Sequence, residues 1–294
     1  MEKFLIFRTD RVGDFLLSLI LIKNIKKRYS NSEITIIASE NNSNYIKSFH
    51  VIDRVIILRN NFLSKIKLIF ELRKYYYDTI IVHDGKNRSK FVSYFLKYKK
   101  RILCKTDLIN SQFDIIKKVC TEMRLDLDNE CINFLDDRIH NITKLPFNNY
   151  VHLHFDEKWF YNEYIKKYIN IEPSQNELLQ FIDNIISKDK NLIITTGKNS
   201  SELIEKIKEK IDESKIRIYE KQSLIEIENI VFKSDLLIAC HGWISHIASA
   251  KKVKQIDIID DSYPYHTWTS HFRNYQTVKR KTFNLLSKEI ISFL

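Results

Sequence analysis

Charged residues follow directly on an apolar run near the start of the chain, in the stretch FRTDRVGDFLLSL at 7–19. The run FLIF has the composition of a buried strand, and apolar residues return after Asp14 with the spacing of a helix. The loop between them contains Arg8, Asp10, Arg11, Gly13 and Asp14. Arginine donors pair with carboxylates and phosphates, and an aspartate at a helix start is held ionised by the helix dipole and nearby cations. The loop thus has the residue types of an anion-binding site, although Asp14 can also be a plain helix cap.

The four glycines of the chain share one sequence context. Each follows an apolar, β-branched run and precedes a helical pattern, and they are Gly13, Gly85, Gly197 and Gly242. A strand, a glycine-bearing turn and a helix form the repeating unit of an α/β sheet, and ligands of such sheets bind at the carboxyl ends of the strands. A single glycine of this kind only eases a tight turn. Four at the same end of the strands predict a ligand site there.

The rest of the chain repeats this alternation. Strands are predicted near 4–8, 33–39, 52–59, 78–83 and 101–104, and then near 150–155, 191–196, 215–219, 235–239 and 254–259. Helices are predicted near 14–29, 62–76, 88–98 and 111–124, and then near 157–169, 175–188, 199–212, 222–233, 243–251 and 281–293. The stretch TKLPFNNY at 143–150 contains one of three prolines and has the composition of a linker. We predict two αβ domains, 1–146 and 147–294, with a terminal helix able to pack back on the first.

Composition limits the class of protein. With 44% hydrophobic and 29% charged residues, the chain is that of a globular protein, and no apolar run approaches the roughly 20 residues of a bilayer span. The N-terminus lacks the long apolar segment of a secretory signal. We therefore expect a cytoplasmic protein with four reduced thiols, which are Cys104, Cys120, Cys131 and Cys240. The net charge of +11 favours an anionic partner, although AT-rich coding sequence, which favours lysine, isoleucine and asparagine, is an alternative origin of the excess.

Several common motifs are missing or weak. Neither G-x-G-x-x-G nor G-x-x-x-x-G-K-[ST] occurs, which argues against a dinucleotide fingerprint and a P-loop. LDLDN at 125–129 has the form of a metal-binding D-x-D but follows a helix, so we interpret it as a solvated loop. His152 and His154 share one face of a strand without a third metal ligand at suitable spacing. The basic run KNIKKRY at 23–29 falls on a helical face, and no nucleic-acid-binding module is recognisable.

The opening stretch, extended through residue 39, resembles the N-terminus of the ADP-heptose:lipopolysaccharide heptosyltransferases, glycosyltransferase family 9. In that family a strand ends in Arg or Lys, and a short polar loop leads to Gly-Asp and a helix. The likeness continues, more weakly, in YDTIIVHDGKNRSKF (77–91), VHLHFDEKWFYNEYI (151–165) and NLIITTGKNSSELIEKI (191–207). It is clear again, but altered, at 223–259.

This resemblance implies an α/β GT-B fold, in which two Rossmann-like domains face each other across a cleft. It also implies an inverting, metal-independent mechanism without a cofactor. Asp14 matches the family's catalytic aspartate, which takes a proton from the acceptor hydroxyl. The implied acceptor-binding residues are Arg8, Asp10, Arg11, Gly13 and Arg88. Arg8 and Arg11 are suited either to hold phosphate groups of the acceptor or to orient Asp14. The implied donor-binding residues are Lys158, Thr195, Thr196, His241, Gly242, Trp243 and His246.

The sequence departs from the family pattern after the strand near 235–239. The family has Asp-[Ser/Thr]-Gly followed closely by Met/Ser-His, whereas this chain reads CHGWISH at 240–246. The aspartate that contacts the sugar in the family is Cys240 or His241 here, and an acidic residue after the second glycine turn is Lys198 or Asn199. A buried, structural histidine is the alternative for His246.

The resemblance therefore favours a transferase that moves heptose from ADP-heptose onto a lipopolysaccharide or lipooligosaccharide core or a related surface glycan. The alternatives are a transferase of the same fold with another nucleotide sugar, and a catalytically silent GT-B module that binds a glycan or a partner. The expected partners are a nucleotide-sugar donor and an anionic glycolipid or oligosaccharide acceptor, with peripheral inner-membrane association and no nucleic acid.

Overall fold

The computed structural model describes residues 1–105, 110–128, 145–160 and 168–294. Contacts divide the chain into two compact units. Unit 1 comprises residues 1–139 together with 266–271, and unit 2 comprises residues 140–265 together with 272–294. None of the described helices is both long enough and apolar enough to cross a bilayer.

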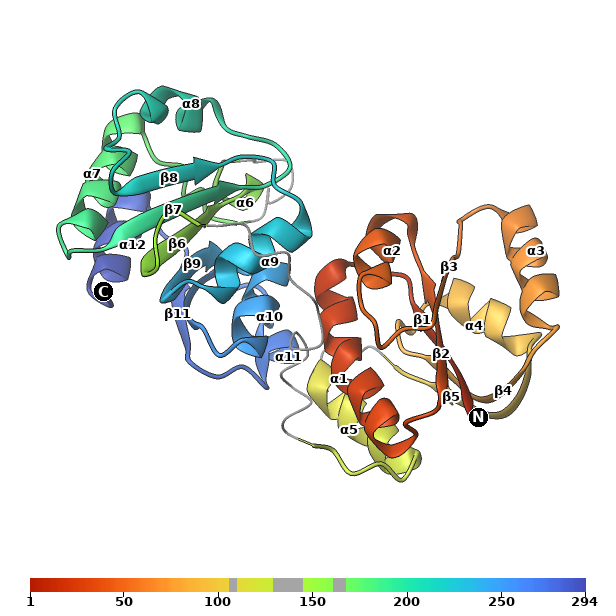
Figure 1. Ribbon diagram of the computed structural model, residues 1–294. Coiled ribbons are helices and arrows are strands. Elements are labelled where there is room, and N and C mark those ends of the chain that lie inside the picture. The colour runs from red at the N-terminus through yellow and green to blue at the C-terminus, as the bar shows by residue number, and fades with distance from the viewer. Residues whose placement is uncertain (106–109, 129–144, 161–167) are drawn as a thin grey trace. The chain divides into compact units, whose positions relative to one another are not determined.

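Unit 1 is built on a parallel sheet of five described strands in the order β3-β2-β1-β4-β5. Its elements alternate along the chain as β1 (Lys3–Arg8), α1 (Val12–Arg28), β2 (Glu33–Ala38), α2 (Glu40–Lys47), β3 (Arg54–Ile57), α3 (Phe62–Leu72), β4 (Tyr76–Val82), α4 (Asn87–Tyr94), β5 (Lys97–Leu103) and α5 (Gln112–Glu122). Helices α1, α2 and α5 lie together on one side of the sheet, and α3 and α4 lie together on the other (Figure 1). The central strands are therefore covered on both faces, which is why they read as continuous apolar runs.

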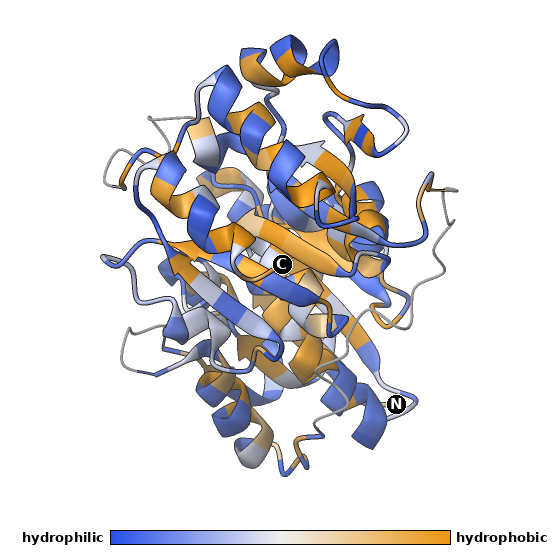
Figure 2. Ribbon diagram, turned by 90° about the vertical axis from the view of Figure 1, so that its left-hand side faces the viewer, coloured by the Kyte–Doolittle hydropathy of each residue, from blue (hydrophilic) through white to orange (hydrophobic). Residues whose placement is uncertain are grey.

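Unit 2 repeats this plan with a parallel sheet of six described strands in the order β11-β10-β9-β6-β7-β8. Its elements are β6 (Tyr150–Phe155), α6 (Glu157–Phe160), α7 (Gln175–Ile186), β7 (Asn191–Thr196), α8 (Glu202–Lys208), β8 (Ile216–Tyr219), α9 (Leu224–Phe232), β9 (Leu236–Cys240), α10 (Trp243–Ala250), β10 (Lys254–Ile259), β11 (Tyr275–Lys279) and α12 (Phe283–Ile291). The main core packs α7, α8 and α12 against the sheet. Figure 2 shows the hydropathy of these elements: the inner strands are hydrophobic, and the helices combine hydrophobic with hydrophilic residues.

The terminal helix α12, which the sequence indicated as able to pack back on the first domain, contributes to the core of unit 2. The buried residues of α12, Phe283, Leu286 and Ile290, belong to the core of unit 2. The apolar side of the helix is thus used inside unit 2. A different segment of the second half belongs to unit 1, namely residues 266–271 with the short helix α11 (His266–Thr269). In that segment the ring of His271 stacks on Phe113 with centroids 5.4 Å apart.

Three described elements were not predicted, and each has a weak apolar pattern. Helix α2 (ENNSNYIK) begins with a capping box in which the backbone N–H of Ser39 donates to Asn42 at 2.9 Å. Strand β11 (YQTVK) is a polar edge strand with one fully buried residue, Val278. Helix α11 has only four residues. Of the other predicted features, Cys131, part of the helix predicted at 157–169 and the start of the linker predicted at 143–150 lie outside the described residues.

Candidate functional site

Each sheet reverses its strand order at one place, and most of the predicted site residues lie in the loops next to that place. In unit 1 the chain runs from β1 outward to β2 and β3, and then returns to add β4 on the other side of β1. In unit 2 it runs from β6 to β7 and β8, and then returns to add β9 beside β6. Ligands of open α/β sheets bind outside the carboxyl ends of the strands at such switch points. The candidate ligand-binding segments are therefore the loops after β1 and β4 in unit 1 and the loops after β6 and β9 in unit 2.

Arg8 ends strand β1 and is 1% exposed, so its side chain is enclosed by the protein, and its role in acceptor binding stays a prediction. Its Nε and one terminal nitrogen donate hydrogen bonds inside unit 1, whereas the other terminal nitrogen is buried and has no hydrogen-bond partner among the described residues. Nε donates to the carbonyl oxygen of Asp14 at 2.8 Å, and one terminal nitrogen donates to the Asp10 carboxylate at 3.0 Å and to the carbonyl of His83 at 3.3 Å. The alternative role, in which Arg8 orients Asp14, agrees with this geometry, because Arg8 fixes the backbone at Asp14.

Asp14 lies in the first turn of α1 and caps that helix. Its carboxylate accepts the backbone N–H of Arg11 at 3.1 Å, as in a capping box. Gly13 precedes it inside the first turn of the helix rather than in a turn before it. The side chain is half-buried, and one hydrogen bond leaves its carboxylate with further acceptor capacity. The capping role and a role as proton acceptor are thus compatible at this position.

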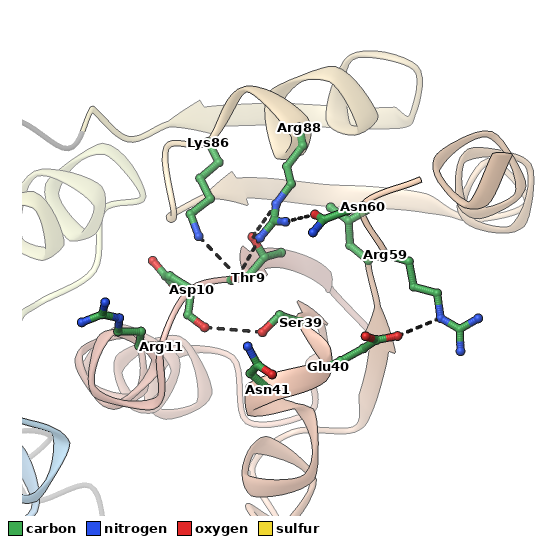
Figure 3. Close-up of a pocket in the computed structure, with 11 residues that line it drawn as sticks. Thr9, Asp10, Arg11, Ser39, Glu40, Asn41, Arg59, Asn60, Lys86 and Arg88 are labelled. Carbon is green, nitrogen blue, oxygen red and sulfur yellow. Dashed lines mark hydrogen bonds and ion pairs between the residues drawn. The ribbon is translucent and has the colours of Figure 1, made fainter. Parts of the chain in front are cut away.

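A polar pocket of about 280 Å³ lies beside this loop and collects cationic side chains (Figure 3). Its lining comes from the loops after four strands, β1 to β4, and includes Asp10, Arg11, Arg59, Lys86 and Arg88. Arg88, predicted as an acceptor-binding residue, donates from one terminal nitrogen to the carbonyl and to the hydroxyl oxygen of Thr9, both at 2.8 Å. The Lys86 ammonium reaches the Thr9 carbonyl at 3.4 Å. The structure therefore brings Asp10, Arg11 and Arg88, three of the predicted acceptor-binding residues, to one pocket.

One residue that holds this pocket in place, Asp84, was not predicted from the sequence. Asp84, after β4, is buried and accepts the hydroxyl of Thr9 at 2.6 Å and that of Ser89 at 2.7 Å. It also accepts the backbone N–H of Lys86 at 3.1 Å. Because Asp84 ties the loop after β1 to the start of α4, it fixes the positions of Thr9 and Arg88. The only available signal was a charged residue directly after the apolar run TIIVH.

Asp10 has an unusual protonation equilibrium. Burial raises its pKa to about 6 against the attraction of Arg8, and the neighbouring carboxylates of Asp14 and Asp84 also raise it. As pH falls through about 6, Asp10 gains a proton and loses its negative charge, so the pocket becomes more positive. We expect sulfate, whose own charge is constant in this range, to bind unit 1 more tightly at about pH 5 than at about pH 7. Isothermal titration at several pH values measures this.

Asp10→Asn is the control for that experiment and should remove the pH dependence while leaving sulfate affinity high. Binding should also weaken with added salt, since exposed charges are screened over about 8 Å at physiological ionic strength. Affinity that is constant with both pH and salt would show that the pocket does not bind anions.

In unit 2, Lys158 lies against the backbone at the start of α10. It forms an ion pair with the buried carboxylate of Asp156. Gly242 is the N-cap of α10, and a Cβ at that position would stand 2.8 Å from the Lys158 ammonium. The helix start presents backbone N–H groups and the positive end of the helix dipole. Lysine and helix start thus converge on one point at the switch between β6 and β9, where an anion can bind.

The approach of Lys158 to Gly242 leads to a prediction. Gly242 has an extended backbone (φ −180°), so alanine is tolerated conformationally, but its methyl group must displace the lysine ammonium. We expect Gly242→Ala to fold with nearly unchanged melting temperature and to bind nucleoside diphosphates about tenfold more weakly. In a Lys158→Ala background, the same change should have little further effect. Additive losses in the double variant would contradict the coupling.

His241 is held by an aspartate that was not predicted. Its Nδ1 lies 2.6 Å from a carboxylate oxygen of Asp257, in the middle of β10. The same buried carboxylate accepts the hydroxyls of Ser245 at 2.8 Å and Tyr275 at 3.0 Å. Three donors thus stabilise one buried charge. With Nδ1 engaged, Nε2 is the ring nitrogen of His241 that can meet a ligand. An aspartate within the apolar run KQIDII was the signal in the sequence.

Two of the remaining predicted donor-binding residues lie inside the core of unit 2. Thr195 and Thr196 are fully buried, so the prediction that they contact the donor is not supported. The hydroxyl of Thr195 lies 2.7 Å from His152 Nε2 and 2.8 Å from His154 Nδ1, and that of Thr196 accepts the backbone N–H of Lys221 at 3.0 Å. These strands are covered on both faces, so their hydroxyls find partners inside the unit.

Trp243 and His246 lie on α10, close to His241. The Trp243 side chain is half-buried, with its ring edge-on to His154 at 6.3 Å. His246 is buried, packs edge-on to Phe272 with centroids 5.0 Å apart, and lies 6.0 Å from the ring of His241. Its surroundings thus fit the structural alternative for this residue. Within the described residues, no group of three or more His, Cys, Asp or Glu side chains is arranged to hold a metal.

Two parallel sheets, each with helices on both faces and polar residues at its switch point, define a GT-B fold of two Rossmann-like units. No protein-family model matches the chain, and no curated protein matches it. Solved structures do match. Heptosyltransferase WaaC of E. coli, in a structure with ADP, has 13% identity and a TM-score of 0.71, and the match covers 99% of this chain and 100% of that one.

Two further structures have the same fold. ADP-heptose lps heptosyltransferase II of E. coli has 12% identity and a TM-score of 0.70, with 99% of this chain and 97% of that one covered. A putative UDP-N-acetylglucosamine 2-epimerase from Listeria monocytogenes has 12% identity and a TM-score of 0.62, with 99% and 88% covered. The resemblance stated from the sequence is thus confirmed for the fold. Because both heptosyltransferases and an epimerase match, the site has to distinguish their chemistries.

Proposed function

We propose that this chain is an inverting, metal-independent glycosyltransferase. It moves a sugar from a nucleotide-linked donor onto an anionic glycolipid or oligosaccharide of the cell surface, at the cytoplasmic face of the inner membrane. Heptose from ADP-heptose is the favoured donor, and a lipopolysaccharide or lipooligosaccharide core is the favoured acceptor. The observation that supports this most directly is the convergence of Lys158 and the start of α10 at the switch point of unit 2.

The leaving group of such a transfer is a nucleoside diphosphate, whose negative charge grows as the bond to the sugar breaks. Lys158 can supply a cation and α10 can supply backbone N–H donors, so the charge is stabilised by the protein's own groups. The WaaC structures with ADP and with an ADP-2-deoxy-2-fluoro heptose support an adenine nucleotide as the donor moiety.

The acceptor side of the reaction uses unit 1. An inverting transfer needs a base to remove the proton of the attacking hydroxyl, and Asp14 has a carboxylate with spare acceptor capacity in the first turn of α1. The helix dipole favours its ionised form. The cations of the adjacent pocket, Arg11, Lys86 and Arg88, suit an acceptor that bears phosphate or carboxylate groups.

A different nucleotide sugar is the second candidate donor, and a specific observation favours it. The residue after Cys240 is a histidine oriented by Asp257, where the heptosyltransferase resemblance implies an aspartate in contact with the sugar. A neutral or positively charged imidazole offers the donor different hydrogen bonds from those of a carboxylate.

A thermal-shift screen of nucleoside diphosphates and nucleotide sugars, with chelator present, tests both donor assignments. A ligand at a hundred times its Kd stabilises the folded chain by about 2.7 kcal/mol. We expect ADP and ADP-sugars to raise the melting temperature. If uridine or cytidine nucleotides raise the melting temperature instead, the assignment of ADP as the donor nucleotide is wrong, whereas the transferase proposal stands. Loss of binding in chelator would refute the metal-free mechanism, and no response to any nucleotide would contradict the proposed function.

A further inference from the structure

The helices α3 and α4 of unit 1 have apolar side chains on their outer sides as well as on their inner sides. The inner side of α3 buries Leu68, Ile69 and Leu72 against the sheet. On the outer side, Leu63 is 80% exposed and Phe70 is 66% exposed. A surface helix normally carries polar residues on its outer side, so these large exposed residues require an explanation.

Helix α4 and the residue that follows it continue this surface with aromatic rings. Phe91, Tyr94 and Phe95 are exposed at helical spacing, and Tyr94 is 68% exposed. The Phe95 ring packs edge-on to Phe91 at 5.2 Å and to Tyr94 at 5.3 Å, so the three rings form one cluster. Helices α3 and α4 contact each other on the same side of the sheet (Figure 1). We call the set Leu63, Phe70, Phe91, Tyr94 and Phe95 the α3/α4 face.

Positive charge is concentrated in the segment of the chain that contains this face. Residues 62–105 contain twelve lysines and arginines and three acidic residues, so they contribute +9 of the chain's net +11. Compositional drift toward lysine would spread the excess positive charge along the whole chain. The excess lies mostly in this one segment instead. Lys67, Lys97 and Lys99 are exposed, and none of them forms an ion pair with any residue that the structure describes. Lys67 lies between Leu63 and Phe70 on the outer side of α3.

We propose that the α3/α4 face docks onto the surface of an anionic lipid bilayer. The aliphatic and aromatic tips enter the headgroup boundary, and the lysines contact lipid phosphates. Charge complementarity selects this partner, because one surface combines unpaired cations with exposed apolar tips. A nucleic acid would satisfy the lysines but leave Leu63 and Phe70 in water. Phenylalanine, tyrosine and lysine together suit an interface that is apolar on one side and charged on the other.

The docking surface and the polar pocket share the same two helices. The pocket includes Arg59 and Asn60, just before α3, and Arg88, in the first turn of α4. Arg88 also donates to Asn60, which links the two helix starts (Figure 3). A chain held on a membrane by the α3/α4 face thus has its pocket at one end of that face. Only this last step, the delivery of a lipid-linked acceptor to the pocket, rests on the proposed function; the docking itself does not.

Flotation of the full-length chain with vesicles tests the docking. We expect binding to vesicles of phosphatidylcholine mixed with phosphatidylglycerol, and little binding to phosphatidylcholine alone. The triple variant Phe91→Ser, Tyr94→Ser, Phe95→Ser should bind at least about tenfold more weakly, and so should Lys97→Glu with Lys99→Glu. Two matched controls on unit 2 should bind normally: Leu285→Ser, an exposed leucine, and Lys188→Glu with Lys210→Glu, two exposed lysines.

Circular dichroism verifies that each variant is folded, and Leu63→Ser with Phe70→Ser in α3 replaces the triple variant should that one fail to fold. Equal binding to neutral and anionic vesicles, or normal binding by the aromatic and lysine variants, would overturn the proposal. Self-association of the wild type that disappears in the triple variant, without vesicle binding, would instead assign the face to a second copy of the chain. Nucleotide-induced stabilisation, measured in parallel, keeps failure of docking distinct from failure of the transferase proposal.

Discussion

Asp14→Asn is expected to fold normally and to lose at least about a hundredfold in transfer rate. The asparagine side-chain oxygen can still accept the backbone N–H of Arg11, so the cap of α1 is retained. What disappears is the ability to accept a proton. A positioned general base contributes about 10²–10⁴-fold, or roughly 3–5 kcal/mol of transition-state stabilisation. Initial rates with a saturating donor, together with melting temperature and nucleotide affinity, provide the measurement.

A matched control exists in the same unit. Asp114 occupies the corresponding first-turn position of α5, where its backbone N–H binds the hydroxyl of Ser111 and its carboxylate also contacts that hydroxyl. Asp114→Asn should change stability about as much as Asp14→Asn but leave transfer intact. Lost stability with full specific activity in Asp14→Asn would reduce Asp14 to a helix cap. Unchanged stability and unchanged activity would remove the base from the proposed mechanism.

Lys158→Ala should weaken nucleoside diphosphate binding by about ten- to hundredfold. A charge-assisted contact contributes about 1.5–3 kcal/mol, and each 1.4 kcal/mol is tenfold in affinity. The lysine is also the partner of the buried Asp156 carboxylate, so its removal should lower the melting temperature. Binding must therefore be measured by titration well below the melting temperature.

Two further variants separate charge from folding at this position. Lys158→Arg keeps a cation beside Asp156 and should recover most of the affinity and most of the stability. Lys188→Ala removes an exposed lysine after α7 and should change neither. Full nucleotide affinity in folded Lys158→Ala would show that the diphosphate does not bind at the start of α10, and would exclude Lys158 from the donor site.

The alternation of strands and helices could be predicted because buried parallel strands need apolar side chains on both faces. The runs FLIF and TIIV therefore stood out, and the glycines after them indicated the carboxyl ends correctly. Strand β11 could not be found in this way, because an edge strand needs few apolar residues. Thr195 shows the same property of a buried strand, because its strand is covered on both faces and its hydroxyl lies against His154.

Long-range partners account for the rest of what was missed. Asp84 lies 75 residues from Thr9, and Asp257 lies 16 residues from His241 on a neighbouring strand. A single sequence contains no signal for such pairs beyond the presence of a charge in an apolar run. Arg8 shows the same limit, because its hydrogen bonds to Asp10 and to the carbonyl of His83 could not be inferred from its position in the sequence.

The assignment of residues 266–271 to unit 1 affects how the chain can be recombined with relatives. A chimera that exchanges everything after the linker would also replace this segment. Thr267 and His271 are buried there, and His271 stacks on Phe113, so the foreign segment would have to fit a surface with which it did not co-evolve. A chimera that keeps 266–271 from the parent of unit 1 avoids the mismatch. Unit 2 could then be exchanged between relatives by grafting two separate stretches of chain rather than one.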